Sequence, residues 1–286
     1  MTPRAVRSSD GVGLAVVEGG TPSGPELLFV HGFCQSHRCW DKQFSDPALQ
    51  HCRLVAFDLR GHGASGKPQA RTSYESDQLW ADDIDAVMTG TGLQRPILVG
   101  WSYGARLVLD YLRIHGAARI AGVNFVASSL RTTTNGNAPR PDLALDLLSD
   151  DLPIRLEATR QFLRRCFASG LDHQDFEHVL AANMLVPAGV RRFILARAPP
   201  AMDLESLADL PILISHGSND PIMSPDVPRS AAARLKTAAF SLYQDAGHAV
   251  FFEQPDRFNR ELADFVHAAN TAAPTGPQHS LNGEPS

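Results

Sequence analysis

Short apolar runs rich in β-branched residues alternate with amphipathic segments along most of the chain. The apolar runs predict strands, and the segments in which apolar residues recur at helical spacing predict helices. The expected strands occupy residues 4–20 (a hairpin that turns at Asp10-Gly11), 26–32, 53–58, 96–101, 119–128, 211–217 and 238–247. The expected helices between them occupy residues 73–92, with an apolar face of Leu79, Ile84, Val87 and Met88, and 105–116, 224–236 and 255–270. Continuous apolar strands alternating with helices are typical of a mostly parallel sheet with helices on both faces.

The strand pattern disappears between about residues 130 and 210. This segment opens on a polar loop and continues as helical patterns at 142–148, 155–169, 173–185 and 189–198. An all-helical block inserted into an alternating α/β chain predicts a cap above the sheet. We therefore expect an α/β core formed by residues 1–129 and 211–270, a helical cap at 130–210, and a disordered tail at 271–286, where Pro, Gly and polar residues dominate.

The composition limits the function classes that need to be considered. The chain has 286 residues, of which 43% are hydrophobic and 20% charged, a balance typical of a globular protein. The formal net charge of -5 does not favour a nucleic-acid or anionic-membrane partner. The sequence has no apolar signal core, no run long enough to span a bilayer, and no cysteine spacing typical of a metal site. We expect a cytoplasmic protein with reduced thiols and no metal or membrane partner, and its oligomeric state is left open.

One expected strand leads through Gly100-Trp101-Ser102-Tyr103-Gly104 directly into a helix. These residues match G-x-S-x-G, in which the serine occupies a strained turn between a strand and a helix. Side chains two positions before and after the serine would collide in such a turn, so both positions need glycine. The turn would expose the Ser102 hydroxyl beside a helix N-terminus, whose N–H groups can stabilise an oxyanion. We predict that Ser102 is a nucleophile.

A serine hydroxyl is a poor nucleophile unless a base takes its proton, and that base is normally a histidine held by a carboxylate. His248 lies in a loop after the last strand, from which an imidazole can reach Ser102. Asp220, just past the preceding strand, is the expected orienting carboxylate, and it completes the chain order Ser, acid, His. The competing carboxylates are Asp226, expected early in a helix, and Asp245, which is too near His248 in sequence to reach its far nitrogen easily.

The loop His31-Gly32-Phe33 follows another expected central strand. The backbone N–H groups of Phe33 and Tyr103 are the expected oxyanion hole. His31 and the segment 58–63 (DLRGHG) are expected to brace loops, and His216, at a strand end, is expected to pack and to bond backbone.

The stretches HGF, DLRGHG, GWSYG, HGSNDP and DAGH, in this order and spacing, resemble the α/β-hydrolase superfamily over roughly residues 27–266. The branch indicated is that of serine esterases and cofactor-free haloperoxidases. The resemblance implies an α/β-hydrolase fold with an eight-stranded, mostly parallel sheet and an inserted helical cap. It also implies a triad of Ser102, Asp220 and His248, with no cofactor and no metal. The peracid-forming members often carry proline just after the aromatic residue, where this chain has Cys34.

These observations predict a serine hydrolase that cleaves a small-molecule carboxylic ester or lactone through an acyl-enzyme. Alternatives with the same fold and triad are hydrolysis of a C–C bond, perhydrolysis or haloperoxidation, and acyl transfer. A non-enzymatic receptor or binding module is a further alternative. The expected lining of an apolar substrate pocket is Trp101, Phe162, Phe193 and Val250, although aromatic residues at helical spacing are also typical of a cap core.

Overall fold

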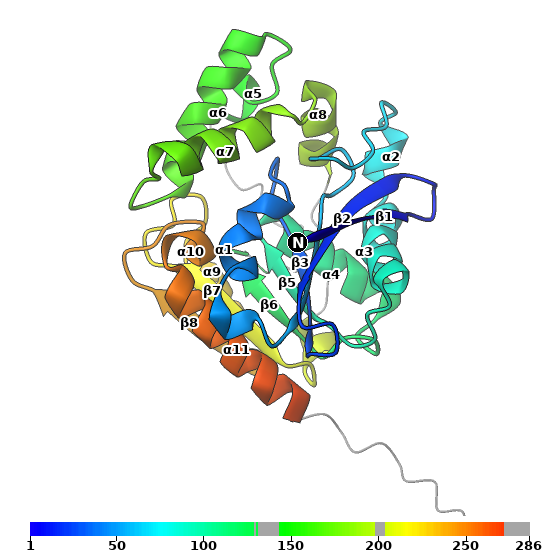
Figure 1. Ribbon diagram of the computed structural model, residues 1–286. Helices are drawn as coiled ribbons and strands as arrows, with labels where there is room; N and C mark the ends of the chain where they lie inside the picture. Colours follow the sequence, from blue (N-terminus) through cyan, green and yellow to red (C-terminus); the bar gives the residue numbers. More distant parts are fainter. Residues whose placement is uncertain (129, 131–142, 198–203, 272–286) are drawn as a thin grey trace, which may run out of the picture.

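A single sheet of eight strands forms the centre of the molecule (Figure 1). The computed structural model describes residues 1–128, 130, 143–197 and 204–271. The strands are β1 (Thr2–Arg7), β2 (Gly13–Gly20), β3 (Glu26–Val30), β4 (Arg53–Phe57), β5 (Ile97–Trp101), β6 (Gly122–Val126), β7 (Ile212–Gly217) and β8 (Ala238–Tyr243). Their order is β1-β2-β4-β3-β5-β6-β7-β8. β2 is antiparallel to both neighbours, and the strands from β4 to β8 are parallel, which confirms the expected α/β-hydrolase sheet.

Helices cover both faces of this sheet. The α-helices are α1 (Asp41–Phe44), α2 (Thr72–Glu75), α3 (Asp77–Thr91), α4 (Tyr103–His115), α5 (Leu143–Asp146), α6 (Leu152–Cys166), α7 (His173–Met184), α8 (Ala188–Ala196), α9 (Asp226–Ala232), α10 (Val250–Glu253) and α11 (Pro255–Thr271). Short 3-10 helices are η1 (His37–Trp40), η2 (Pro47–Leu49) and η3 (Leu204–Leu207). The expected tail begins where α11 ends, and residues 272–286 lie outside the described part of the chain.

Strand alternation divides the core into two apolar clusters, one on each face of the sheet. In β5, Leu98 faces the cluster under α3 and α4. Ile97, Val99 and Trp101 face the second cluster, which includes residues of α10 and α11. Because β5 is buried at every position, both layers of helices are needed to cover it.

The helix expected at 73–92 is broken into α2 and α3. Ser76, between them, has an extended backbone with φ −79° and ψ 123°. After the break, Ile84 is fully buried as expected, but Leu79 is only half-buried, which corrects the expected apolar face. Trp80 is fully buried in the core cluster instead, and its indole N–H donates to the Tyr74 carbonyl at 2.9 Å.

The four helices α5 to α8 lie between β6 and β7 in the sequence and gather at one end of the sheet, at the top of Figure 1. This is the end at which the parallel strands finish, because the Cys166 carbonyl at the end of α6 accepts the backbone N–H of His248, in a loop that follows β8. Within the described residues no single helix is long and apolar enough to cross a membrane. The helices α7 and α8 reach that length and composition only when they are taken together, and an 82° bend separates them.

Candidate active site

The turn from β5 into α4 has the strained geometry expected from its sequence. Ser102 has φ 53° and ψ −110°, in the positive-φ region that L-residues rarely adopt. A Cβ added at Gly100 would lie 2.7 Å from the Cα of Ala105, and one added at Gly104 would lie 2.2 Å from the carbonyl oxygen of Val30. Glycine at both positions therefore allows α4 to approach β3 and β5 closely, and this approach holds the serine at the helix N-terminus.

Ser102, His248 and Asp220 come together in the structure, each from the loop after a different strand. The Ser102 hydroxyl lies 2.8 Å from Nε2 of His248 and can donate to it. The Nδ1–H of the same imidazole donates to Oδ2 of Asp220 at 2.7 Å. His248 and Asp220 are buried, while Ser102 is partly exposed. The three side chains therefore form one continuous hydrogen-bonded relay that ends at an accessible hydroxyl.

The Asp220 carboxylate is held in place by its own loop. Its Oδ1 accepts the backbone N–H groups of Ile222 at 2.8 Å and Met223 at 3.0 Å. Burial alone would raise the pKa of Asp220, but the adjacent His248 and these hydrogen bonds outweigh it and hold the pKa below its usual value. The group is therefore a carboxylate at neutral pH and can accept the imidazole N–H.

His216 also contacts this carboxylate, which the sequence analysis did not predict. Its Nε2 lies 2.9 Å from the Met223 carbonyl, which confirms the expected backbone bond, and 3.3 Å from Oδ2 of Asp220. Burial lowers the pKa of His216, so the ring is neutral and shares one N–H between the two oxygens. The only sequence signal for this contact is the spacing of four residues between His216 and Asp220 around a strand end.

Both backbone polar groups of His248 are hydrogen-bonded. Its N–H donates to the Cys166 carbonyl, and its own carbonyl accepts the indole N–H of Trp101, both at 2.8 Å. The Trp101 ring is buried and packs edge-on against Phe251 at 5.0 Å. Val250 is fully buried in the same cluster. Trp101 and Val250, both expected to line the pocket, therefore also pack beneath the His248 loop.

The other two expected pocket residues lie on the insert. Phe162 is half-buried, and its ring meets that of Phe33 edge-on at 6.5 Å. Phe193, also half-buried, stacks on Tyr74 at 5.8 Å. The structure therefore places Phe162 against a residue of the expected oxyanion loop and Phe193 against Tyr74.

The two expected oxyanion donors follow paired strands. β3 and β5 are parallel with Val30 opposite Gly100, so Phe33 and Tyr103 leave the sheet at the same edge. Tyr103 is the first residue of α4, whose first N–H groups have no partner inside the helix. Among the described residues, neither backbone N–H donates to another group. Both are therefore available to a ligand.

Two buried histidines brace the loops around these donors. Nε2 of His31 accepts the Leu59 N–H at 3.0 Å, and Nε2 of His62 accepts the Cys34 N–H at 3.2 Å. Each ring also bonds a backbone carbonyl through Nδ1, at 2.8 and 2.9 Å. Burial lowers the pKa of His31 to about 4 and that of His62 to about 3, so both rings are neutral at pH 7. This confirms the bracing role expected for His31 and for the segment 58–63.

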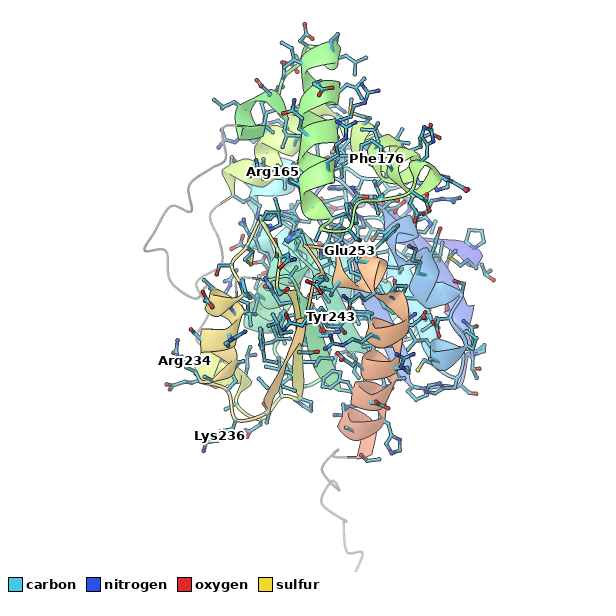
Figure 2. All side chains as sticks on the ribbon, turned by 90° about the vertical axis from the view of Figure 1, so that its left-hand side faces the viewer. Arg165, Phe176, Arg234, Lys236, Tyr243 and Glu253 are labelled. Carbon is cyan, nitrogen blue, oxygen red and sulfur yellow. The ribbon has the colours of Figure 1, made fainter. Side chains whose placement is uncertain are left out.

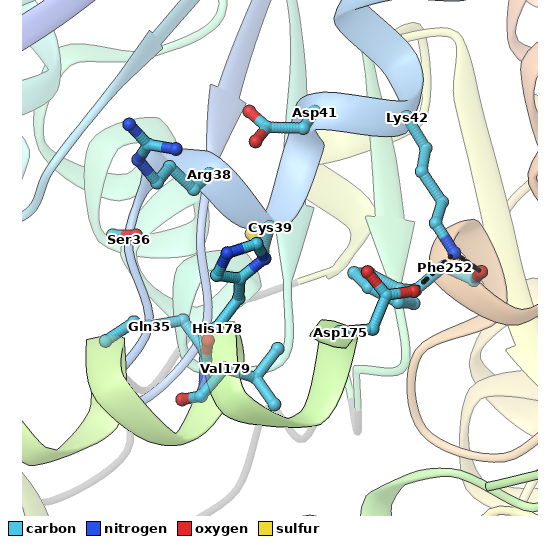
Figure 3. A pocket seen from close by; sticks show the side chains of 11 residues that line it. Gln35, Ser36, Arg38, Cys39, Asp41, Lys42, Asp175, His178, Val179 and Phe252 are labelled. Atoms are coloured by element: carbon cyan, nitrogen blue, oxygen red, sulfur yellow. Dashed lines mark hydrogen bonds and ion pairs between the residues drawn. The ribbon is translucent and has the colours of Figure 1, made fainter. Parts of the chain in front are cut away.

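A small cavity lies between the segment 35–42 and α7 (Figure 3). Its volume is about 70 Å³, and it is closed on one side by Lys42, which reaches Asp175 of α7 and the Phe252 carbonyl, both at 3.2 Å. Ser102 is not part of its lining. The cavity therefore marks a contact between the core and the insert rather than the space above the serine. In the described part of the chain, no cluster of His, Cys, Asp or Glu has the arrangement of a metal site.

Comparison with known proteins agrees with this geometry. The model of the alpha/beta hydrolase family matches residues 27–261. A solved structure described as a putative aryl esterase from Burkholderia cenocepacia is 36% identical, with a TM-score of 0.88, covering 94% of this chain and 100% of that one. An esterase from Rhodococcus sp. ECU1013 is 27% identical, with a TM-score of 0.83 and the same coverage. A relative from Synechocystis named as a putative non-heme chloroperoxidase is 27% identical over 85% of this chain and 92% of its own length.

Proposed function

The chain belongs to the alpha/beta hydrolase family, and we propose that it is a serine hydrolase that cleaves a small-molecule carboxylic ester or lactone through an acyl-enzyme. The observation that carries this proposal is the relay from the Ser102 hydroxyl through His248 to Asp220, with heavy-atom distances of 2.8 and 2.7 Å. The esterases from Burkholderia cenocepacia (described as putative) and Rhodococcus support an ester as the substrate.

Acylation follows from the positions of these groups. Nε2 of His248 takes the hydroxyl proton as Ser102 attacks the substrate carbonyl. Asp220 accepts the Nδ1–H throughout, which keeps the ring in the tautomer with a free Nε2 and stabilises the imidazolium. The tetrahedral oxyanion lies against the N–H groups of Phe33 and Tyr103, each contributing roughly 3 kcal/mol of transition-state stabilisation.

The remaining steps use the same residues in reverse. The His248 imidazolium gives its proton to the departing alkoxide, leaving the acyl group on Ser102. His248 then takes a proton from water, which attacks the acyl carbonyl, and returns that proton to Ser102 as the acid leaves. The reaction consumes one water and needs no redox partner.

We also propose that α5 to α8 act as the cap over this site, within the expected segment 130–210. The contact of Phe162 with Phe33 supports this role, because it sets an apolar surface of the insert beside the predicted oxyanion loop. A substrate with an aromatic or aliphatic group next to its carbonyl would bury that group against these rings.

The relative named as a chloroperoxidase supports a second candidate, peracid formation. Here hydrogen peroxide replaces water as the attacking group on the acyl-enzyme, so the product is a peroxycarboxylic acid and Ser102 is regenerated. The peracid, rather than the protein, would then oxidise halide. Cys34 stands where the peracid-forming members often have proline, so we rank this reaction below ester hydrolysis.

Turnover of a panel of p-nitrophenyl esters and aliphatic lactones tests the proposal. Ser102→Ala should reduce turnover by a factor on the order of 10⁴ or more, because the nucleophile is lost. Ser45→Ala, at the exposed end of α1, is the matched control and should retain full activity. Unchanged ester turnover in Ser102→Ala would contradict the proposal, and a product shift to peracid on adding peroxide would favour the second candidate.

A further inference from the structure

The loop that carries His248 is held by a carboxylate outside the relay. Glu253, at the end of α10, accepts the backbone N–H of Gly247 through Oε1 at 2.8 Å. Gly247 is the residue before His248, so this bond holds the backbone of the loop next to the residue that carries the imidazole. Glu253 lies at the end of α10 that faces the lower end of the insert (Figure 2).

The second oxygen of the same carboxylate holds the insert. Oε2 of Glu253 accepts the backbone N–H groups of Ala168 at 2.8 Å and Ser169 at 3.1 Å, and the Ser169 hydroxyl at 3.3 Å. These residues follow Phe167, the C-cap residue at which α6 ends. One carboxylate therefore joins the His248 loop to the C-terminal end of the first long helix of the insert.

The two segments are also in direct backbone contact. His248 donates its own N–H to the Cys166 carbonyl at 2.8 Å. A Cβ added at Gly247 would lie 2.8 Å from both that carbonyl oxygen and the Ala168 nitrogen, so the contact leaves no space for a side chain. Beneath it, the rings of Phe167 and Phe252 meet edge-on at 5.6 Å.

We propose that Glu253 is a positioning residue that clamps the His248 loop to the end of α6, and thereby couples the placement of the inserted helices to the alignment of the base with Ser102. The proposal rests on the proposed function in one respect, the role of His248 as the base. Displacing α6 would move Nε2 away from the hydroxyl, since the His248 N–H is bonded to that helix end.

A carboxylate suits this role because it only accepts hydrogen bonds, and four donors converge on it. In Glu253→Gln one oxygen becomes an NH₂ group, which would face either the Gly247 N–H or those of Ala168 and Ser169. One side of the clamp is then lost, whichever way the amide turns. The side chain keeps its size, so the variant separates the hydrogen bonds from packing.

The test compares Glu253→Gln with Glu261→Gln. Glu261 accepts two side-chain hydroxyls at 2.7 Å, from Ser241 and Tyr243, and so controls for the general cost of removing a bonded carboxylate. For p-nitrophenyl acetate we expect kcat of Glu253→Gln to fall on the order of 10-fold to 100-fold with KM changed little, and that of Glu261→Gln to stay near wild type. Amide hydrogen exchange should accelerate together in 166–169 and 247–248 only in Glu253→Gln.

Gly247→Ala disturbs the same contact while keeping the Glu253 side chain, because its Cβ would crowd the Cys166 carbonyl, the Ala168 nitrogen and, at 3.1 Å, Oε1 of Glu253. It covers the case in which Glu253→Gln fails to fold. It should give the same loss of kcat and the same paired rise in exchange. The clamp would be overturned if both variants kept the wild-type kcat. It would also be overturned if, in both variants, amide hydrogen exchange rose in only one of the two segments. A wild-type enzyme that turns over no ester would instead defeat the proposed function, and the exchange result would still decide whether Glu253 joins the two segments.

Discussion

Ser102 shows at the scale of single residues how a strained backbone is kept in place. Its positive φ is compatible with the fold because Gly100 and Gly104 let α4 approach the sheet within distances that no side chain permits. Strain of this kind costs of order 1–3 kcal/mol and persists only where surrounding contacts over-determine it. Here the Ser102 N–H also bonds the Val126 carbonyl of β6 at 2.9 Å.

Gly104→Ala should lower the free energy of unfolding by roughly 3 kcal/mol or more, since its Cβ would overlap the carbonyl oxygens of Val30 and His31. The measurement is denaturant unfolding of the purified variant. Gly189→Ala is the matched control, because its Cβ would meet no atom closer than 3.9 Å in α8. Alanine there should raise stability by about 0.5–1 kcal/mol through helix propensity. Equal effects at both positions would contradict the steric account of the turn.

Trp101→Phe removes the hydrogen bond to the His248 carbonyl together with part of the buried ring, and keeps an aromatic side chain beside Phe251. A lost buried hydrogen bond costs about 1–2 kcal/mol, so kcat for ester hydrolysis should fall roughly tenfold while KM changes little. Steady-state kinetics on one p-nitrophenyl ester measure both. A rise in KM with kcat unchanged would instead support the original expectation that Trp101 lines the substrate pocket.

Residue types and spacing were enough to predict Ser102, Asp220 and His248 as neighbours, because the ends of parallel strands meet at one edge. The direction of a side chain was harder to predict. Trp101 adjoins the nucleophile in sequence, yet strand alternation points its ring into the apolar cluster that includes residues of α10 and α11. His216 was assigned to backbone bonding, and its approach to Asp220 depends on how the loop after β7 folds back.

At the scale of elements, the loops after β3 and β4 hold each other through neutral imidazoles. Protonating Nε2 of His31 or His62 would set an N–H against the backbone N–H that the nitrogen now accepts. Asp58 adds a fixed acceptor to the same loops, taking the His37 N–H at 2.8 Å and the Ala64 N–H at 2.7 Å. The loop that carries Phe33 is therefore sensitive to acid.

The pH dependence of stability has a defined direction. Burial lowers the pKa of His31 from 6.5 to about 4 and that of His62 from 6.5 to about 3. The unfolded chain therefore binds protons on these rings that the folded chain does not. The free energy of unfolding should be highest above pH 6.5 and fall as the pH decreases toward 4. Denaturant unfolding at a series of pH values measures this slope.

His62→Gln should make that slope shallower, because a glutamine oxygen can replace Nε2 as the acceptor for Cys34 without titrating. The comparison is most direct between pH 6 and 5, because Asp58, the carboxylate that bonds the same loops, has a lowered pKa and stays ionised in this range. The other carboxylates are the same in both proteins, so their titration cancels in the difference between the two slopes. Identical slopes in the variant and the wild type would show that His62 does not contribute to acid sensitivity.

Apolar periodicity in the sequence predicts the long helices and strands, but it does not predict the short helices. The strands and the longer helices have enough residues for a period to be detected. The four-residue helices α1 and α10 carry no such signal, and both are held by tertiary contacts such as the bonds from Gln43 to Phe251 and Asn259 at 2.9 Å. The break at Ser76 was missed for a similar reason, because the residues on both sides favour a helix.

At the scale of the whole molecule, the insert is joined to the core on opposite sides of the site. Glu253 and Lys42 hold α6 and α7 on one side. On the other side, Arg197 at the end of α8 donates to the Tyr103 hydroxyl at 2.8 Å and to Asp110 at 2.6 Å. The ends of α6 and α8 therefore contact segments that carry proposed catalytic groups, the His248 loop and α4 respectively.

Arg197→Met should lower the free energy of unfolding by roughly 3 kcal/mol or more, because it leaves the buried Asp110 carboxylate without its main partner. The double variant Arg197→Met with Asp110→Asn should recover part of this loss, since the uncompensated charge is removed. Denaturant unfolding measures each variant. Arg113→Met is the comparison, because Arg113 approaches Asp110 only at 3.9 Å, is more exposed, and should contribute less than about 1 kcal/mol. A double variant no more stable than Arg197→Met would contradict the buried-charge explanation.

The most direct test of the central claim is to map the residue modified by a fluorophosphonate and the rate of its modification. We predict a single phosphonylated site at Ser102 in the wild-type protein, no labelling in Ser102→Ala, and labelling slowed by about 100-fold or more in His248→Gln, since the general base is lost. An adduct on another residue, or equal labelling rates in the wild type and His248→Gln, would contradict the assignment of Ser102 as a nucleophile activated by His248.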